Sequence, residues 1–479
     1  MEVMEQQPDM ETRELQSLMT DRPAAVLSLL DMVCTGAVLL AERAVGVLEV
    51  LLSDRGLCGE ALSGLLRPAL LQALQRASME DQHRTTTTSV VSLPLVLRLL
   101  CVVQDAASFS DGDVDGLQFK LLYRVSNLVG RVKTTSSDSL LPALNYLYCN
   151  LSLCPTHLAD RAVSMLLSNT GLIEQIQTVI SSSSSSSLST SPCSALVCCS
   201  RLLLSSLVTL QHLHSSQVHK RIIWRLESPI QQLVFQKRNT DTLLLASSLR
   251  LLQSLLEVDL RSPLVCVTTG TWLTGPRPLE ASDSCLYPLG ARGARSLATA
   301  LYGLVLQKQD VLLRASVNCL RALLDFLQRR SPTTAQYVVQ QPWNRLLVYS
   351  LLSSGERVLL HPASLTLLSL LLQQGGGAIM GGAEVGQVMK VLEGQSVMEL
   401  GQEAEHTLHL LLIQLQNSVG LSLTEELRER VRTMSMSLAE RGPPTPKGPS
   451  ASILRVGDVS ICLSDFNMTT VSVQRSKNS

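Results

Sequence analysis

The chain has 479 residues, with 40 basic and 40 acidic side chains, so its formal net charge is zero. A neutral chain has no long-range field to gather nucleic acid, and we expect no direct nucleic-acid binding. Hydrophobic residues make up 45% of the chain and aromatic residues only 3%, which favours helices packed through leucine, valine and alanine. Only 17% of residues are charged, against about a quarter in an average globular protein. Much of the surface is therefore expected to face other protein.

An acidic segment, residues 1–22, opens the chain and has neither a basic start nor an apolar core, so we expect no secretory signal. The twelve cysteines are then expected to stay reduced, in the nucleus or alternatively in the cytoplasm. The apolar run 195–210 is long enough to suggest a membrane span, but Arg201 at its centre opposes insertion by about 2.5–3.5 kcal/mol. We expect a buried repeat helix there and no membrane contact.

Helical periodicity begins at Pro23 and defines a first repeat block, residues 23–180. Its expected helices lie at 23–53, 59–78 with a break or kink at Pro68, 90–106, 115–132, 138–152, 156–169 and 171–180. Seven serines, 181–187, then open a linker that reaches residue 192. This linker either separates two blocks or interrupts a single stack.

A second repeat block covers residues 193–440. Its expected helices lie at 194–214, 217–237, 241–257, 294–308, 310–330, 334–353, 361–374, 384–393, 397–418 and 423–440. The proline- and glycine-rich segment 261–292 is expected to protrude as a loop, with a β-prone run at 264–269. The tail, residues 441–479, is expected to be disordered, or to pair as a strand with a turn at Gly457.

The helix predicted at 310–330 has a single polar stripe. Its members recur every three or four residues, and they are Asp310, Arg314, Asn318, Arg321, Asp325 and Gln328. The remaining surface is apolar, so this must be an inner helix covered by others. Ala315-Ser316 recurs as Ala246-Ser247 and Ala363-Ser364, and leucines follow each pair five and nine positions on. The pattern predicts an all-α fold, an armadillo- or HEAT-like α-solenoid of stacked helical hairpins with a flexible C-terminal tail.

No motif in the chain indicates catalysis or a cofactor. The best metal-ligand spacing belongs to Cys193, Cys198, Cys199, His212, His214 and His219. The residues between them form an apolar helical run, so we expect buried cysteines and surface histidines and no metal site. Phosphate-binding loops and nucleophile elbows are missing from the sequence, and the carboxylates are sparse and spread through helices, so we expect neither an enzyme nor a small-molecule substrate. Thr445, followed by Pro446, is a candidate proline-directed phosphorylation site, although the tail could equally be inert.

The helices at 29–52, 140–155 and 310–330 resemble those of armadillo repeats. In 140–155, Asn150 falls one position after the asparagine that lines the groove of armadillo units. Most of the chain also resembles the C-terminal part of the vertebrate meiosis inhibitor family of large armadillo-like factors. The resemblance implies a nuclear germ-cell protein that promotes meiotic double-strand break formation and homologous chromosome synapsis, with this chain as a short form or fragment.

The sequence therefore favours a non-enzymatic scaffold whose partners are other proteins. Its predicted partner-binding residues are Arg314, Asn318 and Arg321 on the stripe and Asn150 in the resemblance to armadillo units. Two alternatives remain open. One is a cytoplasmic armadillo-like adaptor, or a transport or regulatory protein, that binds peptides in the same groove. The other is an enzyme whose site is too dispersed to recognise.

Overall fold

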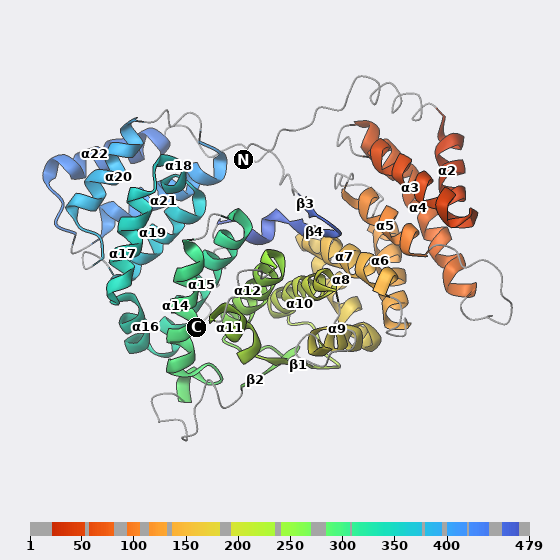
Figure 1. Ribbon diagram of the computed structural model, residues 1–479, viewed down its shortest axis with the longest axis horizontal. Coiled ribbons are helices and arrows are strands. Elements are labelled where there is room, and N and C mark those ends of the chain that lie inside the picture. The colour runs from red at the N-terminus through yellow and green to blue at the C-terminus, as the bar shows by residue number, and fades with distance from the viewer. Residues whose placement is uncertain are drawn as a thin grey trace. The chain divides into compact units, whose positions relative to one another are not determined.

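A computed structural model describes residues 22–52, 57–80, 93–105, 115–131, 137–182, 193–234, 241–269, 284–306, 309–375, 379–394, 400–418, 421–439 and 453–468. Most of the elements in these residues are helices, and the chain forms an all-α solenoid with two short two-stranded sheets (Figure 1). Contacts divide it into two compact units. Unit 1 comprises Met1–Ile223, Pro263–Cys266 and Ile453–Cys462, and unit 2 comprises Trp224–Ser262, Val267–Ser452 and Leu463–Ser479.

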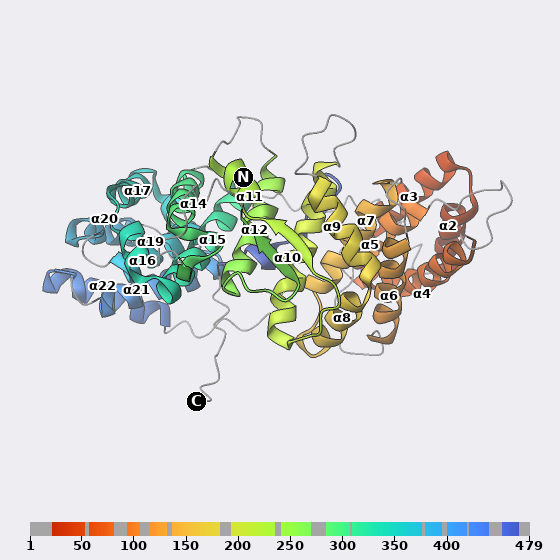
Figure 2. The ribbon, with the colours of Figure 1, turned by 90° about the horizontal axis from the view of Figure 1, so that it is seen from below.

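Unit 1 is a stack of helices in two layers, whose members follow one another along the chain (Figures 1 and 2). In the inner layer, each helix packs against the next: α3 (Val38–Leu52), α5 (Leu93–Asp105), α7 (Ser137–Ser152) and α10 (Ser194–His214). The outer layer contains α2 (Pro23–Thr35), α4 (Leu57–Glu80), α6 (Asp115–Arg131), α8 (Thr156–Ser168) and α9 (Thr170–Ser182). Leucine and valine fill the space between the layers.

Two glycines fix the crossing of α6 and α9. A Cβ atom built on Gly171 would lie 2.7 Å from the carbonyl oxygen of Gly130, and one built on Gly130 would lie 3.3 Å from the amide nitrogen of Leu172. Backbone atoms cannot move aside as a flexible side chain can. The two helices can therefore approach this closely only because both positions lack a side chain.

Unit 2 repeats the two-layer plan. Its inner layer is α12 (Thr242–Glu257), α15 (Asp310–Arg330), α19 (Pro362–Gly375) and α21 (Gln402–Asn417), and each helix again packs against the next. The remaining helices are α11 (Glu227–Val234), α14 (Gly290–Val305), α16 (Pro332–Val339), α17 (Pro342–Ser353), α18 (Glu356–Leu359), α20 (Gly382–Gly394) and α22 (Glu425–Ala439), with 3-10 turns at Ser284–Leu286 (η1) and Leu463–Phe466 (η4).

The repeated Ala-Ser pairs lie where a repeat requires them. Each pair is on one of the successive inner helices α12, α15 and α19, and all six residues are at most 2% exposed. The leucines that follow them are equally buried. Small residues allow the inner helices to approach, and the leucines fill the contact, as expected from the sequence.

One predicted helix is wrong. Residues 217–237 are not a single helix, because strand β1 (Ile222–Arg225) precedes the short helix α11. β1 pairs with β2 (Val265–Thr268), within the run predicted to be β-prone. Ile222 and Trp224 are at most 4% exposed while Ile223 between them is 58% exposed. This alternation has the period of a strand, and the β-branched isoleucines favour it.

Other boundaries differ by local breaks. The helix expected at 23–53 is divided at Gly36 into α2 and α3, and the helix expected at 334–353 is divided before Pro342 into α16 and α17. Pro68 lies inside α4, which continues through it. Helix α10, expected to begin the second block, belongs to unit 1, because the compact units divide at residue 223 and not at the serine-rich run.

The tail contains ordered structure. Strands β3 (Ile453–Val456) and β4 (Val459–Cys462) form an antiparallel hairpin that pairs Val456 with Val459. Its turn is at Gly457, whose φ of 60° lies in the left-handed region that favours glycine. The predicted turn is therefore present. We call residues 453–468, the hairpin with the η4 turn and two further residues, the C-terminal segment.

Candidate functional site

The polar stripe of α15 begins with a network of charges. Arg314 donates through Nη1 to both carboxylate oxygens of Glu403 on α21, at 2.8 and 2.7 Å, and through Nε to Asp310 at 2.7 Å. Burial by itself lowers the pKa of Arg314, but the hydrogen bonds and charges of Glu403 and Asp310 raise it overall. Arg314 is thus held in place within the inner layer of unit 2.

The next stripe residues contact the C-terminal segment. Nδ2 of Asn318 donates to the carbonyl oxygen of Asn467 at 3.4 Å, and the amide of Met468 donates to Oε1 of Glu403 at 2.6 Å. Asn318 is only 2% exposed. The face of unit 2 predicted to receive a partner is therefore covered by residues of the chain itself.

Side chains of the segment add two further kinds of contact. Oδ1 of Asp465 lies 3.6 Å from Nη2 of Arg250 on α12, and both side chains are largely buried, at 14% and 11% exposed. Phe466 and Met468 are each 1% exposed. One buried ion pair and two buried apolar side chains thus anchor Leu463–Met468 on unit 2.

Two arginines are incompletely paired: Arg250, which contacts Asp465, and Arg321, which bonds to the contact residue Asn318. Nη2 of Arg321 donates to Oδ1 of Asn318 at 3.0 Å, whereas Nη1 of Arg321 and Nε of Arg250 are buried with no hydrogen-bond partner among the described residues. Burial lowers the pKa of Arg321, and the nearby carboxylates of Glu257 and Asp325 oppose that shift. These donors are oriented by their helices but are not used by the segment.

Unit 1 holds the hairpin by a related set of contacts. Asn145 on α7 accepts a hydrogen bond from the amide of Ser460 at 3.1 Å, and the hydroxyl oxygen of Tyr148 accepts one from the amide of Cys462 at 3.2 Å. Alternate amides of an edge strand point away from its partner strand and need acceptors. Residues three apart on one helix face supply them to β4.

The two units therefore share one mode of recognition. Inner-layer side chains bond to main-chain groups of the C-terminal segment, at strand β4 in unit 1 and directly after the η4 turn in unit 2, and the segment adds a few buried side chains. Main-chain recognition of this kind tolerates different sequences in the bound segment. Asn145, Tyr148, Arg250 and Glu403 contribute to it but were not predicted. The first three lie in helices that are buried on nearly every side, and Glu403 is one of two acidic residues in the first turn of α21, where a carboxylate needs no partner to be favourable.

Asn150, the fourth predicted partner-binding residue, lies elsewhere on α7. Its Oδ1 accepts a hydrogen bond from Gln118 at 3.3 Å, and its Nδ2 donates to Tyr146 at 3.2 Å. Burial raises the pKa of Tyr146 above its usual range. Asn150 is itself only 3% exposed, so its role in binding a partner remains a prediction.

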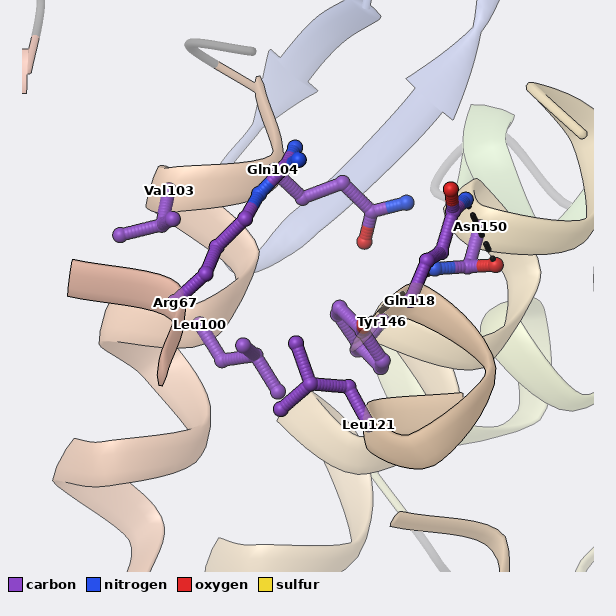
Figure 3. Close-up of a pocket in the computed structure, with 8 residues that line it drawn as sticks. All are labelled: Arg67, Leu100, Val103, Gln104, Gln118, Leu121, Tyr146 and Asn150. Carbon is purple, nitrogen blue, oxygen red and sulfur yellow. Dashed lines mark hydrogen bonds between the residues drawn. The ribbon is translucent and has the colours of Figure 1, made fainter. Parts of the chain in front are cut away.

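These residues line a small pocket with members of α4, α5, α6 and α7. Figure 3 shows the amide of Gln104 pointing into the space between Arg67 and Asn150, and neither polar atom of that amide has a hydrogen-bond partner among the described residues. The water-accessible volume is about 10 Å³, roughly room for one water molecule. A small-molecule site is normally at least about 300 Å³, so this pocket does not accommodate a substrate.

Comparison with known proteins identifies relatives. The chain is 33% identical over 450 residues to human meiosis inhibitor protein 1, and 33% identical over 420 residues to the mouse protein. These alignments cover 93% and 88% of this chain. The chain is a relative of meiosis inhibitor protein 1. It spans about a third of the length of the two curated relatives, 34% of the human and 32% of the mouse protein. No family model and no solved structure matches the chain.

The similarity to meiosis inhibitor protein 1 includes both units, because it extends over most of the chain. Thr445, the predicted phosphorylation site, lies outside the described residues. Within the described ranges, no group of three or more His, Cys, Asp or Glu side chains is placed to hold a metal ion. Cys198 and Cys199 are buried, whereas Cys193, His212 and His219 are exposed.

Helix α10 is long and apolar enough to cross a membrane, and in the part of the chain that the structure describes it is the one such helix. In unit 1, however, 78% of its most apolar 18-residue window is buried against protein. Arg201 at its centre is 4% exposed, and burial lowers its pKa to about 10, which leaves it charged at neutral pH. These are the properties of a core helix of the stack.

Proposed function

We propose that the chain is a non-enzymatic helical-repeat scaffold whose inner layers bind extended polypeptide segments of other proteins. The observation that carries the proposal is the bound C-terminal segment. Side chains on α7 and α15 bond to its main chain at Ser460, Cys462 and Asn467, and any extended segment offers the same groups.

The chemistry of the remaining described residues supports a binding role over catalysis. Several of the ionisable groups with shifted pKa values, including Asp310 and Arg314, take part in ion pairs that hold helices together. The pocket beside Asn150 has room for about one water molecule. We therefore infer that the partners are proteins, and that neither a small-molecule substrate nor a cofactor is needed.

The proposed setting is meiosis in the nucleus of germ cells. Its support is the similarity to two proteins named meiosis inhibitor protein 1, which covers about nine tenths of this chain. The finer role expected from the sequence, promotion of double-strand break formation and chromosome synapsis, is part of the proposal. Imaging a tagged chain in spermatocytes tests the setting, and nuclear exclusion would favour the cytoplasmic adaptor instead.

The binding role is tested with purified full-length chain. Candidate subunits of the meiotic break machinery are mixed with it and separated by size-exclusion chromatography, and co-elution with at least one subunit is expected. Hydrogen exchange on that complex then locates the contact. The proposal predicts altered exchange in α7, α10, α12 or α15 and in the C-terminal segment. Changes confined to outer helices such as α6 and α14 would contradict it.

A further inference from the structure

The inner face of unit 2 contacts the side chains at some positions of the bound segment and leaves the side chains at other positions exposed. Asp465, Phe466 and Met468 are engaged by a buried ion pair or by burial, whereas the side chains of Ser464 and Asn467 are exposed. Asn467 contributes its carbonyl oxygen, which every residue possesses. The face therefore selects an acidic residue, an aromatic residue, any residue and an apolar residue, in that order.

The groups that bond to the segment are polar and can be hydrated. Arg250 and Asn318 meet it from α12 and α15, and Glu403 meets it from α21. Charged and amide side chains regain hydrogen bonds to water when a ligand leaves, unlike leucines of a core. The segment thus occupies a surface equipped for exchange between ligands.

The chain's own segment leaves part of this surface unused. Nε of Arg250 and Nη1 of Arg321 are buried donors without an acceptor among the described residues. Buried donors are normally paired, and hydrogen bonds from a charged group are among the stronger ones in proteins. A segment that brings further carbonyl or carboxylate oxygens to these two arginines has contacts that residues 463–468 lack.

We propose that this face binds a partner polypeptide with the pattern acidic, aromatic, any, apolar, and that residues 465–468 occupy the site as a built-in ligand until the partner replaces them. The proposal rests on the scaffold function proposed above and names the class of its partner. Because the segment belongs to the same chain, it competes at an effective concentration of about millimolar. A partner replaces the segment by supplying hydrogen-bond acceptors to Nε of Arg250 and Nη1 of Arg321.

The test uses a fluorescent peptide with the sequence of residues 463–470, Leu-Ser-Asp-Phe-Asn-Met-Thr-Thr, and the full-length chain. In one variant the chain's own anchors are removed by Asp465→Ala and Phe466→Ala together. The peptide is expected to bind this variant at least tenfold more tightly than the unchanged chain. The control variant Asn467→Ala alters an exposed side chain and should bind the peptide as weakly as the unchanged chain does.

The ion pair between Asp465 and Arg250 allows a second experiment. On the double variant, a peptide with Asn in place of Asp465 should bind about tenfold more weakly than the parent peptide. Adding Arg250→Met to the chain should abolish that difference, because the carboxylate then has no guanidinium to meet. An equal loss for both peptides would assign Arg250 a merely structural role and would overturn the predicted acidic position.

Circular dichroism and thermal unfolding establish whether the double variant is folded. If it is not, hydrogen exchange on the unchanged chain replaces it, and excess peptide should accelerate exchange at the amide of Met468. Unchanged exchange, or equal peptide affinity for the folded variant and the unchanged chain, would overturn the proposal. Dimers formed by mutual insertion of the segment would also overturn it, by making a second copy the occupant.

The outcomes separate this proposal from the scaffold function. Peptide binding as expected, together with no co-elution of any meiotic subunit, would contradict the scaffold function and leave the binding pattern standing. Co-elution of a subunit, together with equal peptide affinity for the double variant and the unchanged chain, would contradict only the proposed pattern of acidic, aromatic, any and apolar residues.

Discussion

Replacement of Asn145 by alanine should loosen the hairpin of the C-terminal segment. Oδ1 of Asn145 is the acceptor for the amide of Ser460, at 3.1 Å, and Ser460 is 1% exposed. Alanine at this position leaves a buried N–H group without an acceptor. We therefore expect the hairpin to open more often while the helices of unit 1 remain folded.

The magnitude for the hairpin follows from the orphaned amide of Ser460; the second donor to Oδ1 of Asn145, Sγ of Cys199 at 3.7 Å, lies on α10 and not on the hairpin. A buried donor that loses its acceptor costs about 1–3 kcal/mol. Every 1.4 kcal/mol is about a factor of ten in an equilibrium, so local opening of the hairpin should become about 5- to 150-fold more frequent. Tyr148→Phe removes the acceptor for Cys462, at 3.2 Å, and should have an effect of the same order.

Hydrogen exchange resolved to single amides measures this opening directly. The amide of Ser460 should exchange faster in Asn145→Ala by the factor given above. Asn150→Ala is the matched control, because Asn150 is a buried asparagine of the same helix that bonds to Gln118 and Tyr146 and not to the hairpin.

The control should leave exchange at Ser460 unchanged, although it also removes buried hydrogen bonds. Equal acceleration in both variants would mean that any loss of packing in α7 loosens the hairpin. No acceleration in either variant would refute the claim that Asn145 holds the segment through its main chain.

Two further predictions concern the scaffold. Gly171→Ala should lower the midpoint temperature of thermal unfolding, because the new Cβ would lie 2.7 Å from the carbonyl oxygen of Gly130. Gly46→Ala is the control: its Cβ would have nothing within 4 Å, so the midpoint should rise slightly. Equal changes of the midpoint in the two variants would contradict the close crossing of α6 and α9. Asp310→Asn should lower the free energy of unfolding by about 0.5 kcal/mol near pH 7, as expected for a partly exposed ion pair. Burial raises the pKa of Asp310, but His361 and Arg314 bring it down to about 2. The contribution of Asp310 to stability is thus present above pH 4 and lost as the pH falls towards 2. Urea titrations should therefore give the same free energy of unfolding for Asp310→Asn and the unchanged chain in acid. A difference that stays constant with pH would contradict the ion pair.

The layers of the fold could be predicted from the sequence because a buried helix face gives a periodic pattern of apolar residues. The stripe on α15 and the Ala-Ser pairs on α12 and α19 are patterns within single helices, and a helix covered on three sides requires them. The β1 strand was missed because its four residues lie between two helical patterns. A run that short has too few positions for a period of two to be distinguished from a buried helix end.

The proposed binding surface could be predicted from the sequence only in part. The stripe residues Arg314, Asn318 and Arg321 were singled out, but the residue that Asn318 contacts, Asn467, lies 149 positions later in the chain. Local periodicity contains no information about such a pairing. On α7, Asn145 and Asn150 are five residues apart and so point to different sides of the helix, and Asn145 is the one that bonds to the hairpin, while a role for Asn150 in partner binding stays a prediction. Both sides are buried, so composition could not show which one meets an extended segment.

The contact between residues 463–468 and the inner helices of unit 2 can be measured by cross-linking with photo-methionine. This analogue replaces methionine with little change in shape, and Met468 is buried on unit 2 with its amide bonded to Glu403. After irradiation of the full-length chain, we expect cross-links from Met468 to residues of α15 or α21. Cross-links from Met468 only to its own neighbours in the tail, or to the outer helices, would contradict it.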